Sequence, residues 1–213
     1  MMHYPILTYI SIFSAVLPFA IGIYRWRYES RELRILVTYL FFCFTVDILS
    51  MWFIRNYWTT LALMHLFFLI ECIFILSIII CLQESTRNKK IFAMFLSVYV
   101  LFWLVAKLTF EPLNGLYSLT ATISSVLLAL SAGYTLFIVI GNRMQSLFSA
   151  HSFWILLSFI IIYAGTLILL SLQGILVNYS REDLFLVESI NWSLKIVFNI
   201  LVTIGFLCPQ TQQ

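Results

Sequence analysis

The residues that could do chemistry lie in one apolar stretch near the end of the chain, which reads ESINWSLKIVFN from Glu188 to Asn199. Its polar residues recur at intervals of three and four, which places them on one face of a helix. That face consists of Glu188, Asn191, Lys195 and Asn199. A cation, a carboxylate and two amides on one face predict a polar binding site inside an otherwise apolar protein.

Lys195 is the residue of this face that most needs a partner. We expect it roughly 16 Å from one end of its helix and about 18 Å from the other, too far from either bilayer surface for the ammonium group to reach water. A lysine at the bilayer centre costs on the order of 3 kcal/mol, so it should face other helices or a wet cavity. Glu71, on another apolar segment, lies at a similar depth, and the sequence therefore predicts a Glu71–Lys195 ion pair.

Other polar residues lie closer to the predicted outer surface, where Asp47, His65 and Asn191 share a depth of roughly 10 Å. They outline a polar pocket that opens outward and has the ion pair as its floor. The predicted ligand-binding residues are Asp47, His65, Glu71, Gln173, Glu188, Asn191, Lys195 and Asn199. Polar pairs between helices can also simply fix the helix register, and this structural reading stays open beside the functional one.

The elements that would position these residues are helices that cross a membrane. Apolar residues make up 62% of the chain and charged residues 10%, with a mean hydropathy of +1.02. Soluble domains are about half apolar and a quarter charged. Segments of about 20 apolar residues can cross a bilayer as helices. Seven such segments are predicted, at Tyr4–Tyr24, Leu33–Ile54, Leu61–Leu82, Ile91–Phe110, Leu116–Ile140, Ser152–Leu176 and Leu184–Leu207.

The fold class predicted from this pattern is all-α, a polytopic seven-helix bundle. The two-residue alternation of a membrane β-barrel is absent from the sequence. The connections are short and polar, so we expect residues 1–213 to form a single transmembrane domain. Pro18 should bend the first helix.

Basic residues in the short loops predict the orientation. One side would hold eight of them, namely Arg25, Arg27, Arg31, Arg34, Arg87, Lys89, Lys90 and Arg143. The other side would hold two, Arg55 and Arg181. This bias predicts an outer N-terminus and a cytoplasmic C-terminus. The net charge of +3 follows from this topology and gives no extended basic surface for nucleic acid.

Catalytic and metal chemistry have little support. Cys43, Cys72, Cys81 and Cys208 fall inside or at the ends of predicted helices, which argues against a disulfide. The three histidines are scattered, and no serine–histidine or multi-histidine constellation is in register. We therefore expect no metal and no cofactor, and a binding protein rather than an enzyme.

Two resemblances bear on the architecture. Seven helices, an outer N-terminus and a mid-membrane lysine in the last helix resemble the retinal-binding rhodopsins, in which that lysine carries the Schiff base. Asn191 stands where microbial rhodopsins have an acidic counter-ion one turn before the lysine. The segments LMHLFFLIE and INWSLKIVFNIL resemble a group of small seven-helix bacterial membrane proteins. This resemblance implies the same architecture and a bacterial cytoplasmic membrane, and no activity.

Three classes of function are compatible with these residues. The first is a receptor-like or accessory module that binds a small ligand or lipid in the outer pocket and couples to a cytoplasmic protein partner. The second is a transporter or an oligomeric channel for a small solute or ion, formed by several copies of the chain. An intramembrane enzyme or a retinal-binding protein comes last. The partners expected are membrane lipids, a small molecule, and a cytoplasmic protein or further copies of the chain.

The topology can be tested directly. A reporter that is active only in the cytoplasm, fused after Gln213, should be active because eight of the ten basic loop residues lie on that side. Activity of a reporter for the outer compartment would reverse the orientation and the predicted opening of the pocket.

Overall fold

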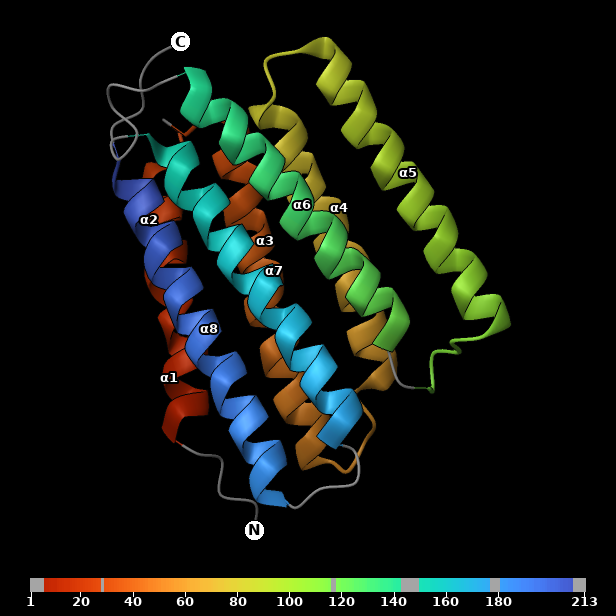
Figure 1. Cartoon of the computed structure of the whole chain (residues 1–213). Helices are drawn as coiled ribbons and strands as arrows, with labels where there is room; N and C mark the ends of the chain where they lie inside the picture. The colour runs from red at the N-terminus through yellow and green to blue at the C-terminus, as the bar shows by residue number, and fades with distance from the viewer. Residues whose placement is uncertain (1–5, 28, 116–117, 143–149, 177–180, 209–213) are drawn as a thin grey trace. The chain divides into compact units, whose positions relative to one another are not determined.

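The computed structural model describes residues 6–27, 29–115, 118–142, 150–176 and 181–208, without the side chains of 118, 142, 173–176 and 181–184. These residues form helices and no strand (Figure 1). The helices are α1 (Ile6–Ser14), α2 (Val16–Arg25), α3 (Arg31–Arg55), α4 (Leu61–Leu82), α5 (Thr86–Thr109), α6 (Ser118–Asn142), α7 (His151–Leu176) and α8 (Arg181–Leu207).

Within the described ranges, seven helical stretches are long and apolar enough to cross a membrane, with α1 and α2 together forming the first. They are 20 to 25 residues long, which matches the hydrocarbon thickness of a bilayer. The predicted all-α class and its seven apolar helices are confirmed. The direction in which the chain crosses the membrane stays a prediction.

The first span is interrupted where the sequence places a proline. The helix breaks at Ala15, whose backbone N–H bonds to Ile12 O instead of the carbonyl four residues back. Pro18 explains the break, because its nitrogen carries no hydrogen for the carbonyl of Ser14 and its ring crowds that carbonyl. The expected bend is therefore a break between two short helices.

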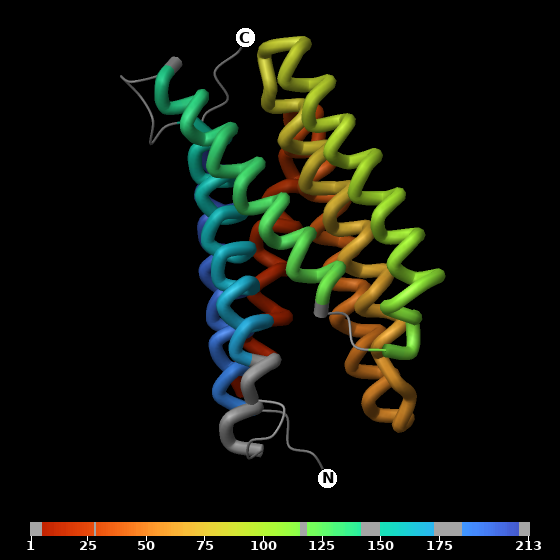
Figure 2. The backbone as a smooth tube through the Cα atoms, turned by 45° about the vertical axis from the view of Figure 1, so that its right-hand side comes forward, coloured from red at the N-terminus to blue at the C-terminus, as the bar shows by residue number. Residues whose placement is uncertain are grey.

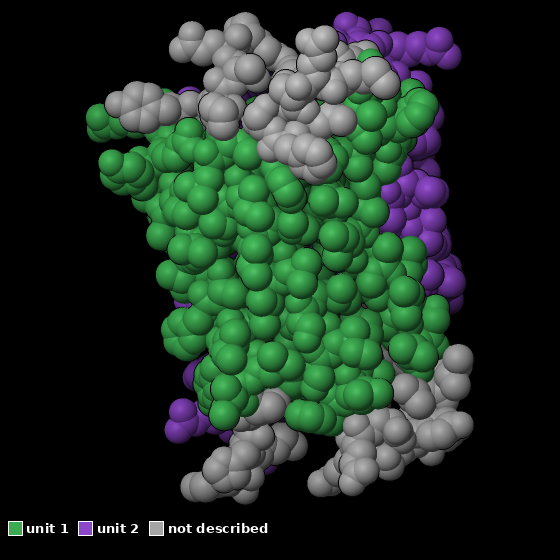
Figure 3. Space-filling model, turned by 60° about the vertical axis from the view of Figure 1, so that its left-hand side comes forward, with its two compact units in different colours: residues 1–29, 132–213 green, residues 30–131 purple. Residues whose placement is uncertain are grey.

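The chain is divided into two compact units, one of residues 1–29 and 132–213 and one of residues 30–131 (Figure 3). The boundary falls inside α6. We call them unit 1 and unit 2 and describe each by itself. The prediction of a single domain is not tested by this division.

Unit 2 is built around α4, which packs against both α3 and α5 (Figures 1 and 2). Its core is aliphatic, with Leu36 on α3 and Ile75 and Ile79 on α4 fully buried. Because the connections between these helices are short, α3 and α5 run antiparallel to α4. The end of α3, the beginning of α4, the end of α5 and the beginning of α6 therefore lie at the same end of unit 2.

Unit 1 is built around the pair α7 and α8, which lie side by side in both backbone views. The stacked rings of Phe159 and Phe198, with centroids 6.1 Å apart, join the two helices. Gly165 on α7 lets them approach closely, because a Cβ there would overlap the Leu194 side chain. Both α1 and α2 pack on α8.

The close approach at Gly165 gives a stability prediction. Gly165→Ala should have a free energy of unfolding about 1 kcal/mol lower than Gly133→Ala, because the Leu194 side chain must shift to make room for the new Cβ, whereas both variants gain the helix propensity of alanine. Gly133→Ala is the matched control, since a Cβ there meets no heavy atom within 4 Å. Thermal unfolding of both detergent-purified variants checks the difference, and equal melting temperatures would contradict the packing.

Candidate functional site

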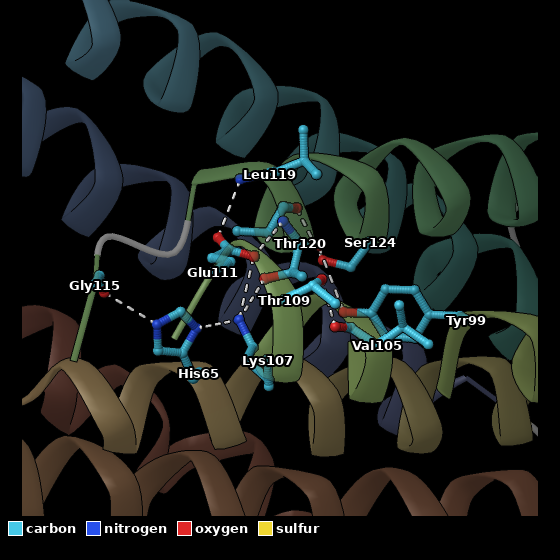
Figure 4. A network of polar contacts seen from close by, with 11 residues as sticks. His65, Tyr99, Val105, Lys107, Thr109, Glu111, Gly115, Leu119, Thr120 and Ser124 are labelled. Atoms are coloured by element: carbon cyan, nitrogen blue, oxygen red, sulfur yellow. Dashed lines mark hydrogen bonds and ion pairs between the residues drawn. The ribbon is translucent and has the colours of Figure 1, made fainter. Parts of the chain in front are cut away.

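A network of polar side chains joins three helices at the end of unit 2 where α4 begins (Figure 4). Lys107 Nζ lies 2.6 Å from His65 Nδ1, 3.2 Å from Glu111 Oε2 and 3.2 Å from Thr120 Oγ1. An ammonium group has three hydrogens to donate, and these three acceptors use all of them. We call His65, Lys107, Glu111 and Thr120 the Lys107 cluster.

Glu111 connects this cluster to the first turn of α6. Its Oε1 accepts the backbone N–H of Leu119 at 3.2 Å and its Oε2 accepts that of Thr120 at 3.2 Å. These N–H groups have no partner inside a helix, and the helix dipole favours a negative charge beside them. Glu111 therefore caps α6 while it neutralises Lys107.

His65 is neutral in this arrangement. Its Nδ1 must accept the hydrogen that Lys107 donates, so Nε2 carries the ring hydrogen and donates it to Gly115 O at 3.1 Å. His65 thus holds the α5–α6 connection through the backbone carbonyl of Gly115. His65 is fully buried, and the Lys107 and Glu111 side chains are only 7% and 6% exposed.

The hydrogen-bonding groups of the Lys107 cluster are already used by partners within the chain. Both nitrogens of His65, the three donors of Lys107 and both oxygens of Glu111 are engaged. Such a network fixes the register of the helices, and a ligand could enter only by displacing these partners. The Lys107 ammonium also lies 5.5 Å from the centre of the Trp103 ring, a cation–π contact that further stabilises the buried charge.

The sequence did not predict this cluster. It placed His65 in a pocket with Asp47 and Asn191, whereas the contacts described for His65 are with Lys107 and Gly115. The signal that could have found it is the spacing of Lys107 and Glu111, four residues apart as in a helical ion pair.

Glu71 is buried, as predicted, and 8% exposed. Its Oε1 accepts a hydrogen bond from the Tyr39 hydroxyl at 2.7 Å, which ties α4 to α3. Glu71 belongs to unit 2 and Lys195 to unit 1. The predicted Glu71–Lys195 pair therefore stays a prediction.

The other predicted residues differ in their surroundings. Asp47 is half-buried in unit 2, and Asn191 and Lys195 are half-buried in unit 1. Glu188 is exposed, so the polar face of α8 is not buried along its whole length. The side chain of Gln173 lies outside the described residues.

The buried part of the α8 face contacts α1. Asn199 is 6% exposed, and its Nδ2 donates a 2.7 Å hydrogen bond to Ser14 Oγ. Further along, Arg25 at the end of α2 donates to the carbonyl of Phe206 near the end of α8. Ser14 pairs with Asn199, and the later residue Arg25 pairs with the later residue Phe206, so α1 and α2 run parallel to α8. Arg25 Nε also lies 3.5 Å from the buried carboxylate of Glu29.

Two hydroxyls on α1 have no hydrogen-bond partner in the described structure. They belong to Thr8 and Ser11, which are 7% and 3% exposed. Relative to the Ser14–Asn199 bond, Ser11 lies about 4.5 Å and Thr8 about 9 Å back along α1, while Lys195 lies about 6 Å back along α8. The two hydroxyls therefore bracket the level of Lys195 within unit 1.

The lack of a hydrogen-bond partner distinguishes Thr8 and Ser11 from many other hydroxyl side chains of the helices. Hydroxyl groups elsewhere on its helices commonly donate to the carbonyl four residues earlier, as Thr45 does to Phe41 and Ser77 to Ile73. We call the polar residues of α1 and α8 on either side of the Ser14–Asn199 bond the α1–α8 seam. They are Thr8, Ser11 and Ser14 on α1 and Asn191, Lys195 and Asn199 on α8.

An open groove of about 280 Å³ lies on a different face of α8, lined by Leu186, Ser189, Ile190, Ser193, Leu194 and Val197. With a step of about 100° per residue, this face is opposite Lys195. It is mostly apolar and holds none of the predicted site residues, so it differs from the polar pocket that the sequence predicts.

Comparisons with protein-family models, curated proteins and solved structures find no match to the chain. In the part of the chain that the structure describes, no three His, Cys, Asp or Glu residues gather where they could hold a metal ion. The classification therefore comes from the fold itself. Helices of this length and apolarity indicate an integral membrane protein built as a helical bundle.

The Lys107 cluster gives a second stability prediction. Lys107→Met should cost about 3–5 kcal/mol, because it leaves the buried Glu111 carboxylate without its cation. Lys89→Met, which removes an exposed lysine of the same helix, is the matched control and should stay within about 0.5 kcal/mol.

The measurement is thermal unfolding in detergent together with hydrogen exchange at the start of α6. Faster exchange of the Leu119 and Thr120 amides in Lys107→Met would show that the cap has loosened. Equal stability of the two lysine variants would rule out a stabilising role for the Lys107 cluster.

Proposed function

We propose that the protein is a receptor-like or accessory membrane module that binds a small ligand or lipid at the α1–α8 seam. The observation that carries the proposal is the pair of buried hydroxyls without partners, Thr8 and Ser11. These two hydroxyls provide donors for a ligand that brings hydrogen-bond acceptors, and the positive charge of Lys195 lies at the same level within unit 1.

An unsatisfied buried hydroxyl is expensive in a membrane. Leaving one without a partner costs about 1–3 kcal/mol, and in hydrocarbon water cannot make up the loss. A carboxylate or another acceptor-rich group would satisfy both hydroxyls and be attracted by the positive charge of Lys195. The ligand class proposed is therefore a small acidic or acceptor-rich molecule, or a lipid bearing such a group.

Satisfaction of hydrogen bonds also decides between the two polar sites. Every donor of Lys107 and both oxygens of Glu111 are used by the chain itself, so the Lys107 cluster is assigned a structural role. The α1–α8 seam leaves two hydroxyls to be satisfied. At the Thr8 and Ser11 hydroxyls a ligand would displace no hydrogen bond of the described structure.

The proposal includes a location and a direction of coupling. The bias of eight basic loop residues to two favours an outer N-terminus in a bacterial cytoplasmic membrane. The ligand would then act on α1, and Arg25, which binds the end of α8, would lie toward the cytoplasmic partner.

Substitutions that remove single hydroxyl groups test the proposal. Thr8→Val and Ser11→Ala remove no hydrogen bond, so the ligand-free protein should be as stable as before or slightly more stable. Both should reduce the amount of ligand that co-purifies and the stabilisation that this ligand provides. Native mass spectrometry and thermal unfolding of the detergent-purified protein measure the two effects.

Thr166→Val is the control in the same unit, because its hydroxyl donates to Ile162 O of its own helix and lies outside the seam. It should leave the ligand bound and change stability by no more than about 0.5 kcal/mol. The proposal is wrong if Thr8→Val and Ser11→Ala leave the co-purifying molecules unchanged, as Thr166→Val should.

A further inference from the structure

Five exposed cations lie at the end of unit 2 where α3 and α5 begin. They are Arg31, Arg34, Arg87, Lys89 and Lys90, and we call them the basic rim. All five lie in the first two turns of helices that are long and apolar enough to cross a membrane. Their position follows from the topology of unit 2, in which α3 and α5 both run antiparallel to α4.

The two halves of the rim meet at the end of α4. Because α4 packs against both α3 and α5 and runs antiparallel to them, the first turns of α3 and α5 lie beside the end of α4, where the charges of Arg31, Glu32 and Lys89 act on the Cys81 thiol. Asn88 on α5 donates to Gln83, the buried residue after α4, at 3.3 Å. The rim is therefore one surface around the end of α4 and not two separate patches.

Four of the five rim cations are not paired with an acidic side chain in the part of the chain that the structure describes. They are Arg31, Arg87, Lys89 and Lys90. The acidic residues of unit 2 beside the rim cations are Glu32 in the first turn of α3 and Glu84 just before α5, so five cations and two carboxylates leave a net charge of +3 within unit 2.

The helix ends do not cancel this charge. The ends of α3 and α5 each add about +0.5 and the end of α4 about −0.5, so together they contribute about half a positive charge. Neutralising the last carbonyls of α4, which carry about half a negative charge, would need far fewer than five cations.

We propose that the basic rim binds the headgroups of anionic phospholipids. The first turns of membrane-spanning helices lie at the level of the headgroups, where a cation is worth about 1 kcal/mol, or roughly a fivefold gain in affinity, against an anionic surface. The phosphate and the surrounding lipid are then held by side chains of two helices at once. This inference is independent of the α1–α8 seam, which lies in the other unit.

The experiment compares two lipids that differ in charge alone. The detergent-purified full chain is mixed with equal amounts of phosphatidylglycerol and phosphatidylcholine with the same acyl chains, and the lipids retained are counted by native mass spectrometry. The wild type should retain phosphatidylglycerol preferentially. Arg31→Gln/Arg87→Gln/Lys89→Gln/Lys90→Gln should lower this preference more than about tenfold, given the roughly fivefold effect of each cation.

Arg55→Gln is the control, because it removes a single exposed cation at the other end of α3 and should lower the preference by no more than about fivefold, less than the fourfold variant does. A salt titration of the wild type keeps the test valid if the fourfold variant does not fold. Salt at 1 M shortens the screening length to about 3 Å and should abolish the preference.

Three results would overturn the proposal. They are equal retention of the two lipids by the wild type, a preference that survives 1 M salt, and a folded fourfold variant with wild-type preference. Inorganic phosphate is added as a separate arm. If phosphate alone stabilised the protein as much as phosphatidylglycerol does, the rim would be a site for a soluble anion and the lipid assignment would fail.

Discussion

Hydrocarbon provides neither donors nor acceptors, and this constraint governs the whole arrangement of the chain. Backbone groups meet it by forming helices, which satisfy their hydrogen bonds internally. Hydroxyl side chains meet it by donating to carbonyls of their own helix, as Thr38, Ser50 and Ser97 do. Groups that cannot be satisfied within one helix then decide which helices must lie together.

Charged side chains follow the same rule on a larger scale. Lys107 and Glu111 could not remain buried as isolated ions, since removing one partner of a buried pair is strongly destabilising. Each is instead surrounded by groups from neighbouring helices, and the α5–α6 connection is held as a consequence. The same logic ties Glu71 to Tyr39 and Arg25 to the end of α8. Much of the specificity of packing therefore comes from a few polar contacts between otherwise uniform apolar surfaces.

The sequence predicted the helices well because their signal is strong and local. The predicted segment Leu61–Leu82 coincides with α4, and the other boundaries differ by a few residues. The contacts were harder to predict, because α4 is apolar on nearly all sides and its sequence does not show which face meets which helix. His65 illustrates this, since its depth gave no sign of its contact with Lys107, while its predicted place beside Asp47 stays a prediction. Depth follows from sequence position, but the direction of a side chain follows from packing.

The predicted polar face of α8 also shows that the partner of a polar residue is harder to predict than its position on a helix. Asn199 of this face is buried, and its partner, Ser14, lies on a helix to which no polar role was assigned. The break at Ala15 makes α1 a separate helix of nine residues, and several of its large side chains, including Ile6 and Phe13, are exposed. In a membrane such exposed apolar side chains face lipid, so the place of α1 is set by its packing on α8 and by the Ser14–Asn199 bond. A polar contact whose second member lies on a helix with little polar signal is the part of a bundle that sequence spacing cannot find.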